Sequence, residues 1–158
     1  MRMKVPWIYL CLSLFPLLAY GGQEEAVPLH AIPQEIIHIA NQIQPEAVFH
    51  RAQIETEEDG TEVYEILGKL PDGMRVEVDI LKNGDIQEYE LEFSEYQVPG
   101  AVLKAIQKKL PGFQPSYIEA SHSASGKVMR YEFEGTLGDQ SIDIEVSASG
   151  RKIEVADN

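Results

Sequence analysis

Strict alternation of apolar and charged residues, ended by a glycine turn, constrains this chain more than any other feature. The stretch MRVEVDILKNGDI at 74–86 alternates in this way, and QSIDIEVSASGRKIEV at 140–155 repeats the pattern. Because successive side chains of a strand point to opposite faces, each stretch predicts a strand with one apolar and one acidic face. An antiparallel sheet that is covered on one side has this pattern.

Two amphipathic segments can supply the cover. The segments IPQEIIHIANQI at 32–43 and VPGAVLKAIQKKLPG at 98–112 carry apolar residues at helical spacing. Each has a proline near its start, and Pro45 and Pro111 stop the two helical patterns. These features predict two helices. Strand patterns separated by glycine turns follow each helix. The predicted strands are 47–57, 62–69, 74–81 and 86–93 after the first helix, and 116–121, 128–136, 141–147 and 152–155 after the second.

The order of helix and strands therefore occurs twice, and an internal repeat of this length indicates one supersecondary unit used twice. We predict an α+β fold of two tandem units, each one helix packed on a three- to four-stranded antiparallel meander. The predicted units are residues 32–94 and 95–158. A unit of this size has a marginal core by itself, so we expect the two units to pack together or to join their sheets.

The N-terminal residues have a different composition. Residues 1–21 combine basic residues, an apolar run and small residues, which predicts a signal peptide and a periplasmic or secreted protein. An uncleaved anchor is the alternative. Cleavage would remove Cys11, the one cysteine, and leave no thiol for disulfides and no membrane span. Residues 22–31 are predicted to be a polar tether.

The segments VYEILGKLPDGMRVEVDILKNGDI and MRYEFEGTLGDQSIDIEVSASGRKI carry a YE–G–VxV–G order. In this order the chain resembles the PepSY domain, and within it the PepSY-like group related in fold to the secreted beta-lactamase inhibitor protein. The resemblance covers residues 32–157. It implies a secreted or periplasmic, non-enzymatic module that binds or restrains another protein, often a peptidase, and it supplies no catalytic residues.

The net charge of −13 argues against a nucleic-acid partner and favours a cationic one. We predict a binding module, with inhibition or modulation of a peptidase or other hydrolase as its role, and another envelope or secreted protein as its partner. The oligomeric state is not predicted. The candidate partner-binding residues are aromatic side chains near the join of the units and two lysines of the second helix. They are Tyr89, Tyr96, Phe113, Tyr117, Lys104 and Lys108. Core packing of the aromatic rings and a helix-dipole role for the lysines are the alternatives.

Metal, cofactor and catalytic sites are not predicted. The four histidines share no metal-ligand spacing, and no nucleophile elbow or phosphate-binding glycine loop is present. The acidic residues leave one alternative function, a calcium-associating envelope protein. Glu88, Glu90 and Glu92 would share one strand face in that case, although a solvated outer surface is the simpler interpretation.

Overall fold

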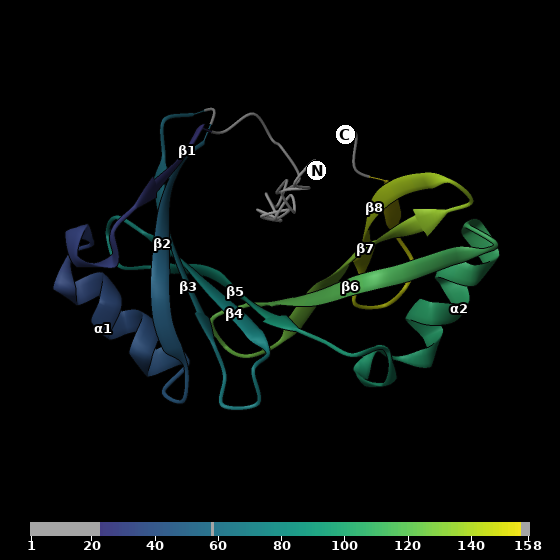
Figure 1. Cartoon of the computed structure of the whole chain (residues 1–158), viewed down its shortest axis with the longest axis horizontal. Helices are drawn as coiled ribbons and strands as arrows, with labels where there is room; N and C mark the ends of the chain where they lie inside the picture. Colours follow the sequence, from purple (N-terminus) through teal and green to yellow (C-terminus); the bar gives the residue numbers. More distant parts are fainter. Residues whose placement is uncertain (1–22, 58, 156–158) are drawn as a thin grey trace, which may run out of the picture.

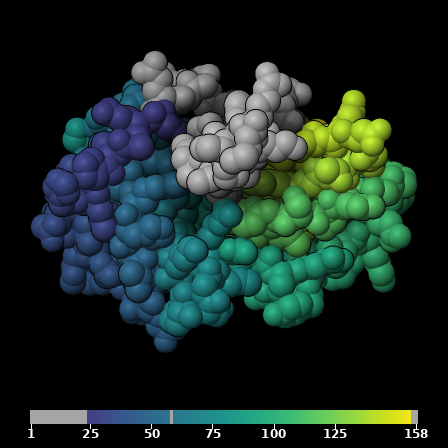
Figure 2. Space-filling model, in the orientation of Figure 1, coloured from purple at the N-terminus to yellow at the C-terminus, as the bar shows by residue number. Residues whose placement is uncertain are grey.

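The strands of this protein form one continuous antiparallel sheet. The computed structural model describes residues 23–57 and 59–155. Each strand pairs with the next along the chain, so the sheet has the order β1 to β9 (Figure 1). In Figure 2 the purple to teal half of the chain accordingly lies at one end of the molecule and the green to yellow half at the other. The strands are β1 (Gln23–Val27), β2 (Val48–Thr56), β3 (Glu62–Lys69), β4 (Arg75–Leu81), β5 (Ile86–Glu92), β6 (Phe113–His122), β7 (Val128–Leu137), β8 (Gln140–Ser147) and β9 (Ile153–Val155).

This topology contradicts the predicted α+β fold of two helix-on-meander units. The protein is mostly β-structure, and β5 pairs directly with β6 through the register Tyr89↔His122 to Glu92↔Glu119. The prediction failed because alternation shows which residues share a face of a strand but not which strand lies beside it. The helix between β5 and β6 concealed their pairing, since consecutive strands with an intervening helix gave no hairpin signal.

Two short helices lie on the outer side of the curved sheet (Figure 1), as the amphipathic segments predicted. They are α1 (Gln34–Ile43) and α2 (Gly100–Lys109), and each begins after a proline. Short 3-10 turns, η1 (Leu29–Ala31) and η2 (Glu95–Gln97), precede them. The inward stripe of α1 packs on β2–β5, and that of α2 packs on β6–β9. Burial of these apolar stripes, rather than helix propensity, holds such short helices in place.

The apolar side chains gather in two clusters on the helix-covered face of the sheet. The first cluster contains Ile32, Ile36, Ala40, Ala52, Tyr64, Ile66, Val76, Val78 and Ile80. The second contains Val98, Val102, Ile106, Ile118, Ala120, Tyr131, Phe133, Ile144, Val146 and Ile153. One sheet thus carries two cores, and the β5–β6 pairing connects them.

Two glycines permit a close approach of neighbouring strands. A Cβ on Gly68 would lie 2.7 Å from the carbonyl oxygen of Val48, and one on Gly135 would lie 2.4 Å from that of Gln114. The Phe113 ring covers Gly135 and would lie 2.6 Å from the same Cβ. Register irregularities occur in β2 and β6 beside these contacts. The glycine of the YE–G pattern therefore has a packing role in this chain.

The segment expected to be a tether instead contributes to the sheet. Within residues 22–31, Gln23–Val27 form β1, which pairs with β2, and Leu29–Ala31 form η1. The predicted signal peptide and Cys11 lie outside the described residues. Among the described helices, none is long and apolar enough to cross a membrane.

Candidate functional site

The sheet face opposite the two helices carries more than half of the chain's Asp and Glu residues. By the alternation of β-strands, the side chains that face away from α1 and α2 are largely carboxylates. We call this surface the acidic face. Its cations are Arg51, Lys69, Arg75 and Arg130. Its carboxylates are Glu24, Glu55, Glu65, Glu77, Asp79, Glu88, Glu90, Glu92, Glu119, Glu132, Glu134, Asp143, Glu145 and Glu154.

The strand register places these carboxylates beside one another. Asp79 on β4 is the Cα partner of Glu65 on β3 and of Glu88 on β5. Glu119 on β6 is the partner of Glu132 on β7. Like charges opposite each other destabilise a sheet, so this surface carries an electrostatic cost that hydrophobic packing on the other face must offset.

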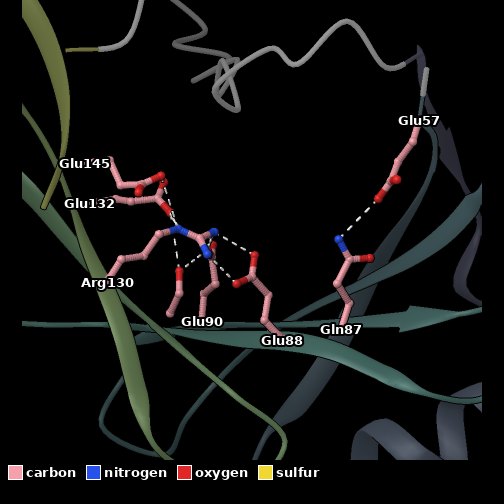
Figure 3. A network of polar contacts seen from close by, with 8 residues as sticks. Glu57, Gln87, Glu88, Glu90, Arg130, Glu132 and Glu145 are labelled. Atoms are coloured by element: carbon pink, nitrogen blue, oxygen red, sulfur yellow. Dashed lines mark hydrogen bonds and ion pairs between the residues drawn. The ribbon is translucent and has the colours of Figure 1, made fainter. Parts of the chain in front are cut away.

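Arg130 on β7 neutralises the centre of the acidic face (Figure 3). Its Nη1 and Nη2 donate to the two carboxylate oxygens of Glu88, each at 2.6 Å. Its Nε donates to Glu132 at 2.9 Å and lies 3.4 Å from Glu145, and Nη2 lies 3.5 Å from Glu90. Burial opposes the charge of Arg130, but the hydrogen bonds and attraction of Glu88 raise its pKa above the usual range. The face therefore holds a guanidinium in a bidentate pair with further carboxylates around it.

Ser121 on β6 lies between the two strands that this ion pair connects. Its hydroxyl donates to Glu90 at 2.7 Å and lies 3.3 Å from Glu132. Ser121 is buried and is the Cα partner of both Glu90 and Arg130. The polar contacts of Arg130 and Ser121 thus cross the junction between the two halves of the sheet.

Several carboxyl groups of this face hold protons more tightly than usual. Burial, followed by the charges of Glu24 and Glu55, raises the pKa of Glu65 to about 7. Burial also raises the pKa of Glu119 to about 7, although a hydrogen bond from Tyr117 opposes the shift. At neutral pH such groups are partly protonated, and a bound cation would favour their ionised form.

Asp79 is a buried carboxylate with an oxygen that lacks a hydrogen-bond donor in the described structure. Its side chain belongs to a residue that is 9% exposed, and its Oδ1 accepts no hydrogen bond within the described structure. Burial and the charges of Glu77 and Glu90 raise its pKa well above the usual range. An irregularity in the register of β4 and β5 follows Asp79, where Gln87 has no partner in the ladder. Gln87 donates to Glu57 at 3.2 Å and points away from Arg130 (Figure 3).

A second arginine lies at another part of the face. The guanidinium of Arg75 lies 4.7 Å from the ring centroid of Tyr117, and the Tyr117 hydroxyl donates to Glu119. Burial, followed by the charge of Glu119, raises the pKa of Tyr117 above its usual range. The backbone N–H of Arg75 donates to Glu92 at 3.0 Å. This face therefore contains both ion pairs and a cation–π contact.

The predicted partner-binding residues do not form one surface. Tyr117 lies on the acidic face. Tyr89 and Phe113 are half-buried and pack against the two apolar clusters, where Tyr89 also stacks on His122 at 4.8 Å. Tyr96, in η2, is 88% exposed. Lys104 and Lys108 are exposed on α2, on the opposite side of the sheet from the acidic face.

Sequence reasoning missed how these acidic residues are used. Glu88 and Glu90, interpreted as a solvated surface, are half-buried and contact Arg130. Ser121, the last residue of the predicted strand 116–121, is buried in β6 and contacts Glu90. A signal was present, because Arg130 begins the alternating segment RYEFEG and shares its face with Glu132. One arginine on an acidic strand face predicts a pairing partner across the sheet.

In residues 23–57 and 59–155, no group of three or more His, Cys, Asp or Glu side chains is arranged to hold a metal ion. The predicted calcium association therefore has no coordinating group to support it in this part of the chain. The carboxylates form pairs and contacts with arginine instead.

Comparisons with known proteins do not identify the chain. No family model and no curated protein matches it. One similar solved structure is a Bacteroides vulgatus protein described as a "putative periplasmic protein of unknown function". It is 16% identical, the match covers 85% of this chain and 100% of that one, and the TM-score is 0.39. Similarity at this level carries no argument about fold or function, and the PepSY resemblance stays a prediction.

Proposed function

We propose that this protein is a non-enzymatic binding protein of the periplasm or the extracellular space, and that its acidic face receives a basic partner protein. The observation that carries the proposal is the imbalance of charge on one sheet face. Carboxylates from strands β3 to β8 adjoin one another there, while a few arginines supply the opposite charge. Such a field attracts cationic partners and accelerates their association.

The acidic face differs from an ordinary solvated surface in its burial. Glu65 is 1% exposed, and Glu88 and Glu90 are half-buried around Arg130. Ion pairs formed by such groups are less screened by salt than pairs on an exposed surface. A basic side chain that reached this face would therefore gain more binding free energy than it would at a typical exposed acidic surface.

The class of partner follows from the predicted secretion and from the PepSY resemblance. Both favour another envelope or secreted protein, and inhibition or modulation of a peptidase or other hydrolase is the role that we propose. Attraction to the acidic face requires only that the contacting segment of the partner be basic. Calcium association is not proposed, because no described carboxylate group is arranged to coordinate it.

The test measures binding of oligoarginine, oligolysine and oligoglutamate peptides of equal length to the purified protein. Both cationic peptides are expected to bind, more weakly as salt is added, whereas oligoglutamate is expected not to bind. Failure of both cationic peptides to bind at low salt would overturn the proposal.

Two triple variants, each with three carboxyl groups replaced, locate the binding surface. The triple variant E119Q/E134Q/D143N removes carboxylates from the acidic face, and its positions have raised pKa values, so neutral side chains should be tolerated. The control E35Q/E46Q/E95Q replaces the same number of carboxyl groups at exposed positions outside this face. Weakened binding is expected in the first variant alone. Equal weakening in both would show that net charge, and not this face, attracts the peptide.

A further inference from the structure

The contacts of Arg130 show how the acidic face accommodates an arginine. Glu88 forms a bidentate pair with the guanidinium, and Glu132 and Glu145 approach its Nε. The planar guanidinium matches the two oxygens of a carboxylate, and it is less strongly hydrated than an ammonium group. These properties suit a half-buried site such as the one that Arg130 occupies beside Glu88.

Asp79 is also surrounded by carboxylates, but no ion pair with an arginine or lysine is seen for it in the described structure. It lies one strand beyond Glu88, as its Cα partner on β4, and Glu65 flanks it on β3. Its Oδ1 is buried and accepts no hydrogen bond within the described structure. The charges that act most strongly on it are carboxylates, with Glu77 and Glu90 first. A buried carboxylate oxygen that lacks a donor costs free energy, which a cationic donor would recover.

The carboxylates on either side of Asp79 already accept hydrogen bonds, whereas its Oδ1 can accept one more in the described structure. Glu65 accepts a hydrogen bond of 3.0 Å from Gln53, and Glu88 is already paired with Arg130. A donor that reached Asp79 would therefore lie between one carboxylate held by an amide and another held by a guanidinium. A side chain with several N–H groups in a plane can satisfy Asp79 and contact Glu65 at the same time.

We propose that Asp79, flanked by Glu65, is the anchoring position for an arginine side chain of the basic partner. This inference rests on the proposed function, since it names the group that the acidic face recognises. The occupant is an arginine rather than a lysine because a fork of donors matches adjacent carboxylates, whereas an ammonium acts as a point charge. Loss of the proton that Glu65 partly retains at neutral pH would accompany binding.

The test compares binding of the oligoarginine and oligolysine peptides to the wild-type protein and to three variants. Asp79→Asn is expected to weaken oligoarginine binding by about tenfold or more, which corresponds to the loss of one charged hydrogen bond. Glu134→Gln removes another carboxylate of the acidic face and is expected to weaken it by less than about threefold. Asp139→Asn, in the exposed turn before β8, serves as the control outside the face. Wild-type protein is expected to prefer oligoarginine over oligolysine, and Asp79→Asn is expected to reduce that preference.

The outcomes separate this inference from the proposed function. If both cationic peptides bind and Asp79→Asn has no larger effect than Glu134→Gln, the anchoring role is overturned while the proposed function stands. If neither cationic peptide binds, both are overturned. Asp79→Asn keeps the shape of the side chain and removes repulsion, so it is expected to fold, which its melting temperature checks. Glu65→Gln is a second variant for the same site, with a weaker but parallel effect expected.

Discussion

The guanidinium of Arg130 on β7 reaches across β6 and pairs with both carboxylate oxygens of Glu88 on β5 at 2.6 Å. This pair spans the one strand pairing that connects the two halves of the sheet. On the other face, Tyr89 and His122 stack at the same junction with ring centroids 4.8 Å apart. The two cores are thus joined by backbone pairing, an ion pair on one face and an aromatic stack on the other.

Replacement of Arg130 by methionine is expected to destabilise the protein by about 2 to 3 kcal/mol, because it leaves half-buried carboxylates without their cation. Urea unfolding at pH 7.5 measures the change. The control is Lys82→Met, which breaks an exposed ion pair with Glu62 and is expected to give no measurable change. The prediction is wrong if the two variants have equal stability.

Stability is expected to increase as the pH falls from 8 to 6. Because the pKa values of Glu65 and Glu119 are raised to about 7 in the folded state, the folded chain binds more protons than the unfolded chain over this range. The gain ends near the ordinary pKa of 4.5, where the unfolded chain is also protonated. We expect the melting temperature to be higher at pH 6 than at pH 8 by about 4 °C or more.

The double variant Glu65→Gln with Asp79→Asn provides the control for this pH dependence. It is expected to be more stable than the wild-type protein at pH 8 and to show a smaller change between pH 8 and pH 6. A wild-type melting temperature that falls over the same interval would contradict the assignment of raised pKa values to this face.

Gly135→Ala is expected to destabilise the protein by about 1 to 3 kcal/mol, since its Cβ would collide with the backbone of Gln114 and the ring of Phe113. Gly100→Ala is the matched control. A Cβ there meets no atom within 4 Å, and the residue begins α2, so the change should be neutral or stabilising. Chemical unfolding of both variants measures the difference, and similar stabilities would exclude the packing role of Gly135.

His122 is expected to act as a packing residue at the junction. It is buried between Tyr89 and Phe93, and its Nδ1 has no hydrogen-bond partner within the described structure. His122→Phe should therefore retain wild-type stability at pH 7, whereas His122→Ala should lose about 1 to 3 kcal/mol through the lost contacts. Thermal unfolding distinguishes the variants, and a large loss in His122→Phe would indicate that the imidazole nitrogens are required.

The local structure of this chain follows closely from its residue pattern. The helical spacing in 32–43 and the alternation in 74–81 predicted α1 and β4 almost to the residue. Both signals arise from contacts near in sequence, because they reflect which side of an element is buried. Each helix also packs on strands that follow it, because its apolar stripe needs burial.

A joined sheet was one of the two expected arrangements, but the strands that pair at the join could not be identified in this way. Glu92 pairs with Glu119, and the two residues lie on either side of α2 in the sequence. Nothing in the sequence near either residue indicates which residue it pairs with. The candidate site depends on the same long-range pairing, since Arg130 meets Glu88 only when β5, β6 and β7 are neighbours. Aromatic residues were favoured as binding candidates because the sequence shows the type of each residue. It does not show which side chains from different strands lie together on one face of the sheet.

A sheet that runs in chain order from β1 to β9 ends, in the described structure, with two strands that each have a neighbour on one side only. Such margins invite further strands from other molecules and can start fibre growth. The margin at β1 carries exposed Glu24 and Glu25, and that at β9 carries exposed Glu154. Two copies that approached edge to edge would bring like charges together, so we expect the acidity of these margins to oppose such pairing.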